Sequence, residues 1–546
     1  MPGAALRRRR APSRCIYIIV GIPPPAARRP AVARARRGPI HRCARRSPRM
    51  PERLAPSPRS PSMPFDPIVD MPAHTLAEAI RRKDVSCVET MRAYLAHIER
   101  VNADVNAIVA LREPDALLAE AAQKDAALAR GEYAGWLHGM PQAPKDLAMT
   151  KGIVTTLGSP IFRTMTPSVD AIVVERMRAA GAVFIGKTNT PEFGLGSHTF
   201  NEVYGVTRNP YDLSKSAGGS SGGAAAALAA RMLPVADGSD FGGSLRNPAA
   251  FCNVYGFRPS QGRVPRWPSV DVFVQQLGTE GPMGRTVVDV AQLLAIQAGY
   301  DRRDPLSLAE DPRRFTQSLD ADMRGKRIAW VGDWNGYLAM EAGVLELCES
   351  SFDTLRAIGC DIDAALPAFP AERIWRSWLA HRHLLSGGNL LMHYREPSRR
   401  ALLKPEAIYE AQGLFALGAA DVYEASAARS AWYQALIAFF ERFDYIAAPS
   451  AQVFAFDVEL RWPQAIAGRA MDTYHRWMET VVPWTLAGCP VISVPVGFNA
   501  AGLPMGMQLI GRPRDDFAVL QLARAYEKER DWVRARPPAL SGARND

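Results

Sequence analysis

Apolar residues recur at helical spacing after Ser86, which forms a capping box with Glu89. The repeat predicts a helix that ends near Asn102, with an apolar face made by Met91, Tyr94, Leu95 and Ile98. A second helix is predicted to open at Asp170 and to stop at Gly181, where glycine suits a helix end. Further helices are predicted at residues 224–230, in several segments of 340–445, and from Asp516 onward.

Short unbroken apolar runs alternate with these helices. They predict buried strands at residues 182–185, 326–331, 491–496 and 505–510, with a turn at 500–502 between the last two. Helices that alternate with buried strands are typical of an α/β layer architecture. We therefore predict an α/β domain over residues 63–537 and a short disordered tail at 538–546.

The first 62 residues differ sharply from the rest of the chain. They hold sixteen arginines, no lysine and one acid, Glu52, and they are rich in proline, so they cannot bury a core and are predicted to be disordered. The whole chain has a net charge of +11, and this segment alone carries +15. The remaining residues therefore carry −4 and lack the overall basic surface of a nucleic-acid binder. Four interpretations stay open for the segment: an organelle transit peptide, a signal peptide, a basic arm that binds nucleic acid, and translated upstream sequence before a start near Met63, which we favour.

Cysteine and histidine usage argues against metal sites and disulfides. The seven cysteines are odd in number and lack a C-x-x-C pair, which indicates a reducing compartment, taken here as the cytoplasm. His381, His383 and His393 lack a metal-binding pattern such as H-E-x-x-H and are predicted to lie on a polar helix face. No apolar run reaches about 18 residues, so we expect no membrane span. We expect no cofactor and no metal.

Two serine-bearing glycine loops carry the candidate chemistry. The first reads Ala-Gly-Gly-Ser-Ser-Gly-Gly at 217–223 and the second reads Asp-Phe-Gly-Gly-Ser-Leu-Arg at 240–246. Glycine lets backbone N–H groups approach a ligand closely, and a serine held in such a loop can attack a carbonyl while those N–H groups receive the oxyanion. Lys145, well before both loops, offers a base. The set predicts acyl transfer without histidine.

Two other motifs compete with this interpretation. Residues 181–188 match the P-loop pattern G-x-x-x-x-G-K-[ST] of nucleotide binders, but the residues between the glycines read as a strand and a turn follows, so we interpret the match as false. The first loop also matches the nucleophile elbow G-x-S-x-G, which would use a late acid and histidine such as Asp472 and His475. The elbow explains neither the second loop nor Lys145.

At these residues the chain resembles the amidase signature family of Ser-Ser-Lys hydrolases. Gly-Gly-Ser-Ser-Gly-Gly at 218–223 and Gly-Gly-Ser-Leu-Arg-Asn-Pro at 242–248 carry the resemblance, which extends over about residues 70–530. It implies a single large α/β domain with a mixed, twisted central sheet covered by helices on both faces. It also implies hydrolysis of a linear carboxylic amide, a small-molecule substrate and a possible homodimer. The alternative within the family is the glutamine-hydrolysing A subunit of a tRNA-dependent amidotransferase.

The resemblance also assigns roles to residues. It implies Ser244 as nucleophile, Ser220 as the bridging serine on a cis peptide, and Lys145 as base. The oxyanion hole would consist of the backbone N–H groups of Phe241, Gly242, Gly243 and Ser244, with Ser221, Asp240 and Arg246 in support. Pro144, Phe241 and Asn247 depart from the residues that the family usually has at these positions.

A lysine can act as a base at neutral pH only if its surroundings change its acidity. The pKa of a lysine in water is about 10.4, and burial lowers it because the charged form loses its hydration. Lys145 could then accept a proton from Ser220 while Ser220 accepts one from Ser244, since a hydroxyl donates and accepts at once.

Overall fold

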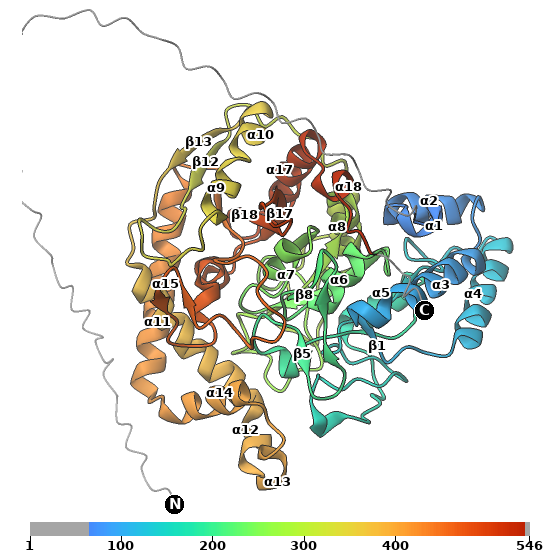
Figure 1. Ribbon diagram of the computed structural model, residues 1–546, viewed down its shortest axis with the longest axis horizontal. Coiled ribbons are helices and arrows are strands. Elements are labelled where there is room, and N and C mark those ends of the chain that lie inside the picture. Colours follow the sequence, from blue (N-terminus) through green and yellow to red (C-terminus); the bar gives the residue numbers. More distant parts are fainter. Residues whose placement is uncertain (1–64, 541–546) are drawn as a thin grey trace, which may run out of the picture. The chain divides into compact units, whose positions relative to one another are not determined.

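An eight-stranded sheet forms the centre of the computed structural model, which describes residues 65–540 (Figure 1). Its order is β13-β12-β14-β18-β17-β10-β11-β9. In that order the strands are Asp361–Ala364, Arg327–Trp330, Tyr445–Pro449, Pro504–Ile510, Val491–Phe498, Tyr255–Arg258, Thr279–Gly284 and Val235–Asp240. The strands predicted at 326–331, 491–496 and 505–510 are therefore confirmed within two residues at each end.

The sheet is mixed. The strands β13, β12 and β14 pair in parallel, and every pairing from β14 to β9 is antiparallel. The longest pairing joins β17 to β18, with Val491 opposite Ile510, and a register shift lies between Pro495 and Gly497. The chain passes from β17 to β18 through the predicted turn.

Helices cover both faces of this sheet, as its alternating side chains require. Ile328 of β12 packs in one hydrophobic cluster, and its neighbour Ala329 packs in another, since successive side chains of a strand point to opposite faces. The first cluster includes α8 (Val287–Gln297), α9 (Val344–Glu349), α10 (Phe352–Ala357) and α17 (Asp516–Glu529). The second includes α11 (Ala371–Arg382), α15 (Ala419–Phe440) and α16 (Val482–Ala487). The predicted α/β class is confirmed.

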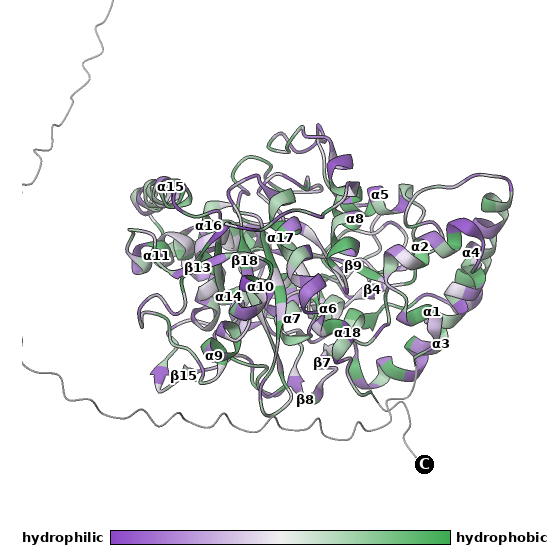
Figure 2. Ribbon diagram, turned by 90° about the horizontal axis from the view of Figure 1, so that it is seen from above, coloured by the Kyte–Doolittle hydropathy of each residue, from purple (hydrophilic) through white to green (hydrophobic). Residues whose placement is uncertain are grey.

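A third cluster joins the first helices of the described chain to the alanine-rich helix α6 (Gly222–Ala229). These helices are α1 (Pro67–Asp70), α2 (Ala73–Arg82), α3 (Cys87–Val105) and α4 (Pro114–Ala129). They lie on the side of the molecule opposite α11 and α15 in both views (Figures 1 and 2). Hydrophilic and hydrophobic residues mix along α4 and α15, as expected of helices with one face in solvent (Figure 2).

The predicted helix boundaries hold where a local cap defines them. The capping box of Ser86 and Glu89 is present, and α3 runs three residues past Asn102 to a left-handed cap at Asn106. The helix predicted to open at Asp170 is α5 (Ile172–Ala179). Asp170 does not cap it, because its carboxylate accepts the N–H of Lys151 and pairs with Arg178.

The remaining elements are short. Paired segments are β1 (Ile108–Val109) with β4 (Lys187–Thr188), β2 (Pro141–Gln142) with β3 (Val183–Phe184), β5 (Phe200–Asn201) with β6 (Gly205–Val206), β7 (Arg208–Asn209) with β8 (Asp212–Ser216), and β15 (Ala465–Ile466) with β16 (Arg469–Ala470). Further helices are α7 (Arg246–Phe251), α12 (Gly388–Arg395), α13 (Pro397–Arg400), α14 (Pro405–Ala416) and α18 (Trp532–Ala535). A π-helical segment, His383–Gly387, joins α11 to α12.

Several sequence predictions concern regions at the ends of the chain. The prediction for residues 1–62 lies outside the described residues, and so does the tail from residue 541. Across residues 65–540, no helix combines the length and the apolar character needed to cross a bilayer.

Candidate active site

The two glycine loops lie against each other. The first follows β8, and its last two glycines are the first residues of α6; the second links β9 to α7. The Ser221 N–H donates to the Ser244 carbonyl at 3.2 Å, which ties one loop to the other. Two serines from segments separated along the chain are thereby held at one place.

Glycine is required at two positions of this arrangement. Gly243 has φ +91°, and a Cβ there would lie 1.9 Å from Asn247 Oδ1. A Cβ on Gly223 would lie 2.3 Å from the backbone nitrogen of Asn189. Any side chain at either position would push the loops away from their neighbours.

Lys145 reaches the first loop from a segment that runs beside β4. Its N–H donates to Asp237 Oδ2 at 3.2 Å, and the residue forms a parallel bridge with Thr188. Pro144 lacks an N–H, but its carbonyl still accepts the Thr188 N–H at 3.2 Å, so the unusual proline leaves this pairing in place.

The amine of Lys145 is surrounded by hydroxyl groups. Its Nζ lies 2.7 Å from Ser220 Oγ and 2.9 Å from Ser221 Oγ. It also lies 3.1 Å from Ser239 Oγ and 3.5 Å from the Ser239 carbonyl oxygen. These partners are three hydroxyls and one carbonyl, so in the described part of the chain no carboxylate pairs with this amine.

Burial changes the acidity of this lysine. Loss of hydration lowers the pKa of Lys145 from 10.5 to about 8, although the charges of Glu280 and Asp237 act in the opposite direction. The neutral amine that a proton acceptor requires is therefore accessible close to neutral pH.

Ser220 and Ser244 line one cavity of about 110 Å³. The peptide bond Gly219–Ser220 is cis. Leu147, Phe193 and Leu195 contribute apolar walls to the cavity. The cavity therefore places the Lys145–Ser220 contact and Ser244 beside the same small space.

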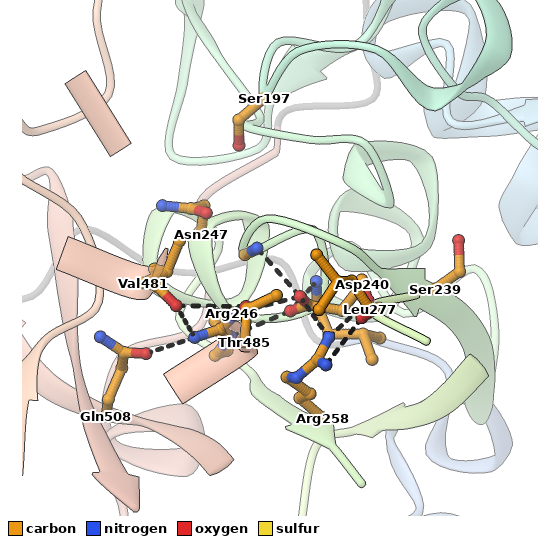
Figure 3. A network of polar contacts seen from close by, with 12 residues as sticks. Ser197, Ser239, Asp240, Arg246, Asn247, Arg258, Leu277, Val481, Thr485 and Gln508 are labelled. Atoms are coloured by element: carbon orange, nitrogen blue, oxygen red, sulfur yellow. Dashed lines mark hydrogen bonds and ion pairs between the residues drawn. The ribbon is translucent and has the colours of Figure 1, made fainter. Parts of the chain in front are cut away.

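Asp240 and Arg246 hold the second loop in shape (Figure 3). Asp240 accepts hydrogen bonds from Arg246 at 2.9 Å and from Arg258 at 3.1 Å, and all three side chains are fully buried. Arg246 also donates to the Gln508 side chain and the Val481 carbonyl. Burial alone would raise the pKa of Asp240, but the charges of the two arginines hold it well below its ordinary value.

One of the four predicted oxyanion donors has an acceptor inside the loop. The Gly243 N–H donates to Asp240 Oδ1 at 2.9 Å, so it is already used inside the loop. The candidate donors that remain are the N–H groups of Phe241, Gly242 and Ser244. Asn247, another unusual residue, donates to the Ser450 carbonyl at 2.9 Å.

The histidine elbow does not form. His475 is buried, with Nε2 2.7 Å from Glu410 Oε1 and Nδ1 3.3 Å from Thr473 Oγ1, and burial lowers its pKa to about 4. Asp472 pairs instead with Arg476.

The prediction of a polar helix face for the other three histidines is wrong, because His381, His383 and His393 are all buried. Nδ1 of His383 lies 2.9 Å from Glu410 Oε2. Within residues 65–540, no group of three His, Cys, Asp or Glu side chains could hold a metal ion.

The lysine of the P-loop match has a structural role. Lys187 is fully buried, and its Nζ donates to the Ala148 carbonyl at 2.5 Å and to Thr150 Oγ1 at 2.6 Å. Its position in β4, with a turn and a 3₁₀ segment after it, leaves no helix N-terminus for a phosphate. The segment therefore belongs to the core.

A comparison with protein families gives one match over most of the chain. The family model described as Amidase matches residues 89–520. The chain belongs to the amidase signature family.

Similar proteins support this membership. The A subunit of glutamyl-tRNA(Gln) amidotransferase from Chloroflexus aurantiacus is 36% identical over 480 residues, which cover 84% of this chain and 96% of that protein. An acylamidase from Rhodococcus erythropolis is 33% identical over 469 residues, which cover 85% of this chain and 96% of that one. The crystal structure of a bacterial aryl acylamidase of the amidase signature family matches with a TM-score of 0.80 and 28% identity, covering 86% of this chain and 98% of the other. This amidase signature protein is an amide hydrolase.

Sequence reasoning missed three side chains of the site. Ser239 contacts the lysine amine, and Arg266 and Arg382 line the cavity. Ser239 could have been found, because it lies on β9 immediately before the second loop and strand side chains alternate. The two arginines come from segments far from both loops, and no local pattern indicates them.

Proposed function

We propose that the chain hydrolyses a carboxylic amide through a covalent intermediate on Ser244, with Ser220 and Lys145 as a proton relay. The observation that carries the proposal is the 2.7 Å contact between Lys145 Nζ and Ser220 Oγ, beside the cavity that Ser244 also lines. Burial lowers the pKa of this amine and so favours its neutral form. A weakly acidic hydroxyl becomes a useful nucleophile when an adjacent group accepts its proton.

The reaction proceeds in two halves. Ser244 Oγ forms a bond to the amide carbon while its proton passes to Ser220, whose own proton passes to the neutral Lys145 amine. The C–N bond then breaks, and the relay returns the proton to the departing amine. Water repeats the sequence on the ester, which releases the carboxylate and restores Ser244.

The backbone N–H groups of Phe241, Gly242 and Ser244 are the proposed donors to the oxyanion. One such donor contributes about 3–4 kcal/mol to the stability of the transition state. The bonds from Asp240 to Arg246 and within the loop support this role, because they hold the N–H groups in one arrangement before substrate binds.

Covalent labelling tests the proposal. Wild-type protein treated with a fluorophosphonate probe is expected to carry one label on Ser244, and Ser244→Ala is expected to carry none. His475→Ala is the control, because the competing elbow mechanism needs that histidine and the proposed relay does not. If folded His475→Ala loses the label, or Ser244→Ala keeps it, the proposed relay is wrong.

A second candidate function is glutamine hydrolysis within an amidotransferase. It is favoured by the 36% identity to a glutamyl-tRNA(Gln) amidotransferase A subunit. That role requires a second subunit and a preference for glutamine. Co-purification of a stoichiometric partner together with strong glutaminase activity would favour it over a stand-alone amidase.

Two further proposals concern the state of the protein in the cell. We place the enzyme in the cytoplasm, which is supported by five buried, unpaired cysteines among the described residues: Cys87, Cys252, Cys348, Cys360 and Cys489. We also propose a homodimer, on the family resemblance alone, and sedimentation velocity of the purified chain tests it.

A further inference from the structure

Two arginines line the catalytic cavity without taking part in the proposed proton relay. Arg382 ends α11, and Arg266 lies in the segment between β10 and β11. Neither is needed to move a proton between Lys145 and Ser244. Their position beside the proposed nucleophile therefore indicates a role other than proton transfer.

Arg382 is held rigidly, with one end of its guanidinium unpaired. Its Nε donates to Glu410 Oε1 at 2.8 Å and its Nη2 donates to Tyr474 Oη at 3.2 Å. No acceptor for Nη1 lies within hydrogen-bonding distance among residues 65–540, although only 7% of the side chain is exposed. The guanidinium carbon lies 4.8 Å from the ring centre of Phe241, whose N–H is a proposed oxyanion donor. A buried, preorganised donor thus stands beside the oxyanion turn.

Arg266 approaches the same turn. A Cβ at Gly278 would lie 2.6 Å from Arg266 Nη1 and 3.6 Å from Phe241 Cδ2, so the absence of a side chain at 278 makes room for the guanidinium. Among the described residues its guanidinium forms one ion pair, with Glu280 at 3.5 Å from Nε, while Asp304 accepts the backbone N–H of Arg266. Phe241 therefore has a guanidinium group near it from each of two separate segments.

The acids around the cavity leave these donors available. Asp240 is paired with two other arginines, Arg246 and Arg258. Burial raises the pKa of Glu280, although Arg266 and Lys145 oppose this, so Glu280 is a weakened counter-charge for Arg266. Glu410 pairs with Arg382 on the side of Nε. The charged residues that line the cavity are thus two arginines, Arg266 and Arg382, and one acid, Asp240, whose charge is already paired, so the cavity favours an anion.

We propose that the substrate of this amidase carries a carboxylate close to the scissile amide, and that Arg266 and Arg382 bind it. Arginine presents a planar fork of donors that matches a carboxylate. Asn389 also lines the cavity, and because its Oδ1 accepts a hydrogen bond from the Gln275 amide, its own amide N–H group adds a neutral donor. The inference rests on the proposed function, because it assumes that amides are hydrolysed at Ser244.

Matched substrate pairs test the proposal. Succinamate is compared with 4-methylpentanamide, in which an isopropyl group replaces the carboxylate on the acyl side. N-acetylglycine is compared with N-isobutylacetamide, which makes the same replacement on the amine side. We expect kcat/KM to be at least about tenfold higher for the charged member of one pair, since a hydrogen bond to a charged group contributes that much. The pair that shows the preference identifies the side of the amide that carries the anion.

Arginine variants attribute the preference to the two side chains. Arg266→Met and Arg382→Lys are each expected to lower the ratio of kcat/KM values within the preferred pair at least about tenfold. Arg382→Lys keeps a charge next to Glu410, which guards against unfolding. Arg327→Met is the control. The Arg327 side chain is 48% exposed, close to the 40% of Arg266, and it also pairs with one acid, Asp363, but it lies outside the cavity. It should leave the ratio unchanged.

Protection of Ser244 gives a second readout that does not need turnover. Succinate or N-acetylglycine should slow fluorophosphonate labelling of wild-type protein, and the effect should weaken in Arg266→Met. Ratios near one in both pairs, or ratios that both arginine variants leave intact, would overturn the inference while amide hydrolysis still stands. Amides that are hydrolysed equally by wild type and Ser244→Ala would instead overturn the proposed function.

Discussion

The acylation rate of Ser244 should depend on pH through Lys145. Burial lowers the pKa of this amine from 10.5 to about 8. Only the uncharged amine can accept a proton, so the rate should rise with pH and level off above about pH 8. At pH 7 about one molecule in ten would hold the neutral amine, against about three in ten thousand for an unburied lysine. Burial thus raises the reactive fraction about three-hundredfold.

Two rates measure this dependence between about pH 6 and 10: fluorophosphonate labelling, and kcat/KM for an uncharged amide. Below pH 8 each should rise about tenfold per unit, as expected for one ionising group. Lys145→Met should lower both rates at least about a hundredfold at every pH, since proton transfer by a positioned group contributes that much.

Lys187 provides a matched control. Burial also lowers its pKa to about 8, but its amine bonds to Ala148 and Thr150 rather than to the serines. Folded Lys187→Met should therefore keep the pH profile of the wild type. The reasoning is refuted if Lys187→Met loses the profile, or if the wild-type rate is already level at about pH 6.

Two predictions concern the second loop. Asp240→Asn should lower the free energy of unfolding, measured in urea, by about 3–5 kcal/mol, because it leaves two buried arginines without a counter-charge. Asp472→Asn is its control: it breaks a more exposed pair and should lower the free energy of unfolding by less than about 1 kcal/mol. Gly243→Ala should lower the free energy of unfolding by at least about 1–3 kcal/mol and abolish labelling, because φ is +91° and the new Cβ would meet Asn247. Gly388→Ala, with φ −58° and open space around it, is expected to be neutral or slightly stabilising in the same urea measurement.

Local signals in the sequence predicted local structure well. The capping box of Ser86 placed the start of α3, and apolar runs placed β17 and β18, because caps and strand burial act within a few residues. The order of the eight strands was not predictable from these signals. It depends on pairings such as β12 with β14, whose partners are more than a hundred residues apart.

Both loops of the site could be predicted from the sequence, but the hydrogen bonds around them could not. Glycine and serine spacing indicated both loops, since only glycine fits where Gly223 and Gly243 meet their neighbours. The use of the Gly243 N–H by Asp240 could not be seen, because it depends on the turn geometry. The buried histidines escaped prediction for a similar reason: Glu410 comes from α14, and His383 and His475 reach it from other segments.

The placement of charge around Lys145 explains why the site needs so large a structural network. Asp240 lies next in sequence to Ser239, whose hydroxyl contacts the lysine amine, and its charge acts to raise the pKa of Lys145. An unpaired carboxylate there would favour the protonated, inactive amine. Arg246 and Arg258 pair with Asp240 and offset that charge, while the loop still gains the hydrogen bonds that Asp240 accepts. The buried ion pairs therefore shape the turn of the proposed oxyanion donors and also favour the neutral amine that the proposed mechanism requires of Lys145.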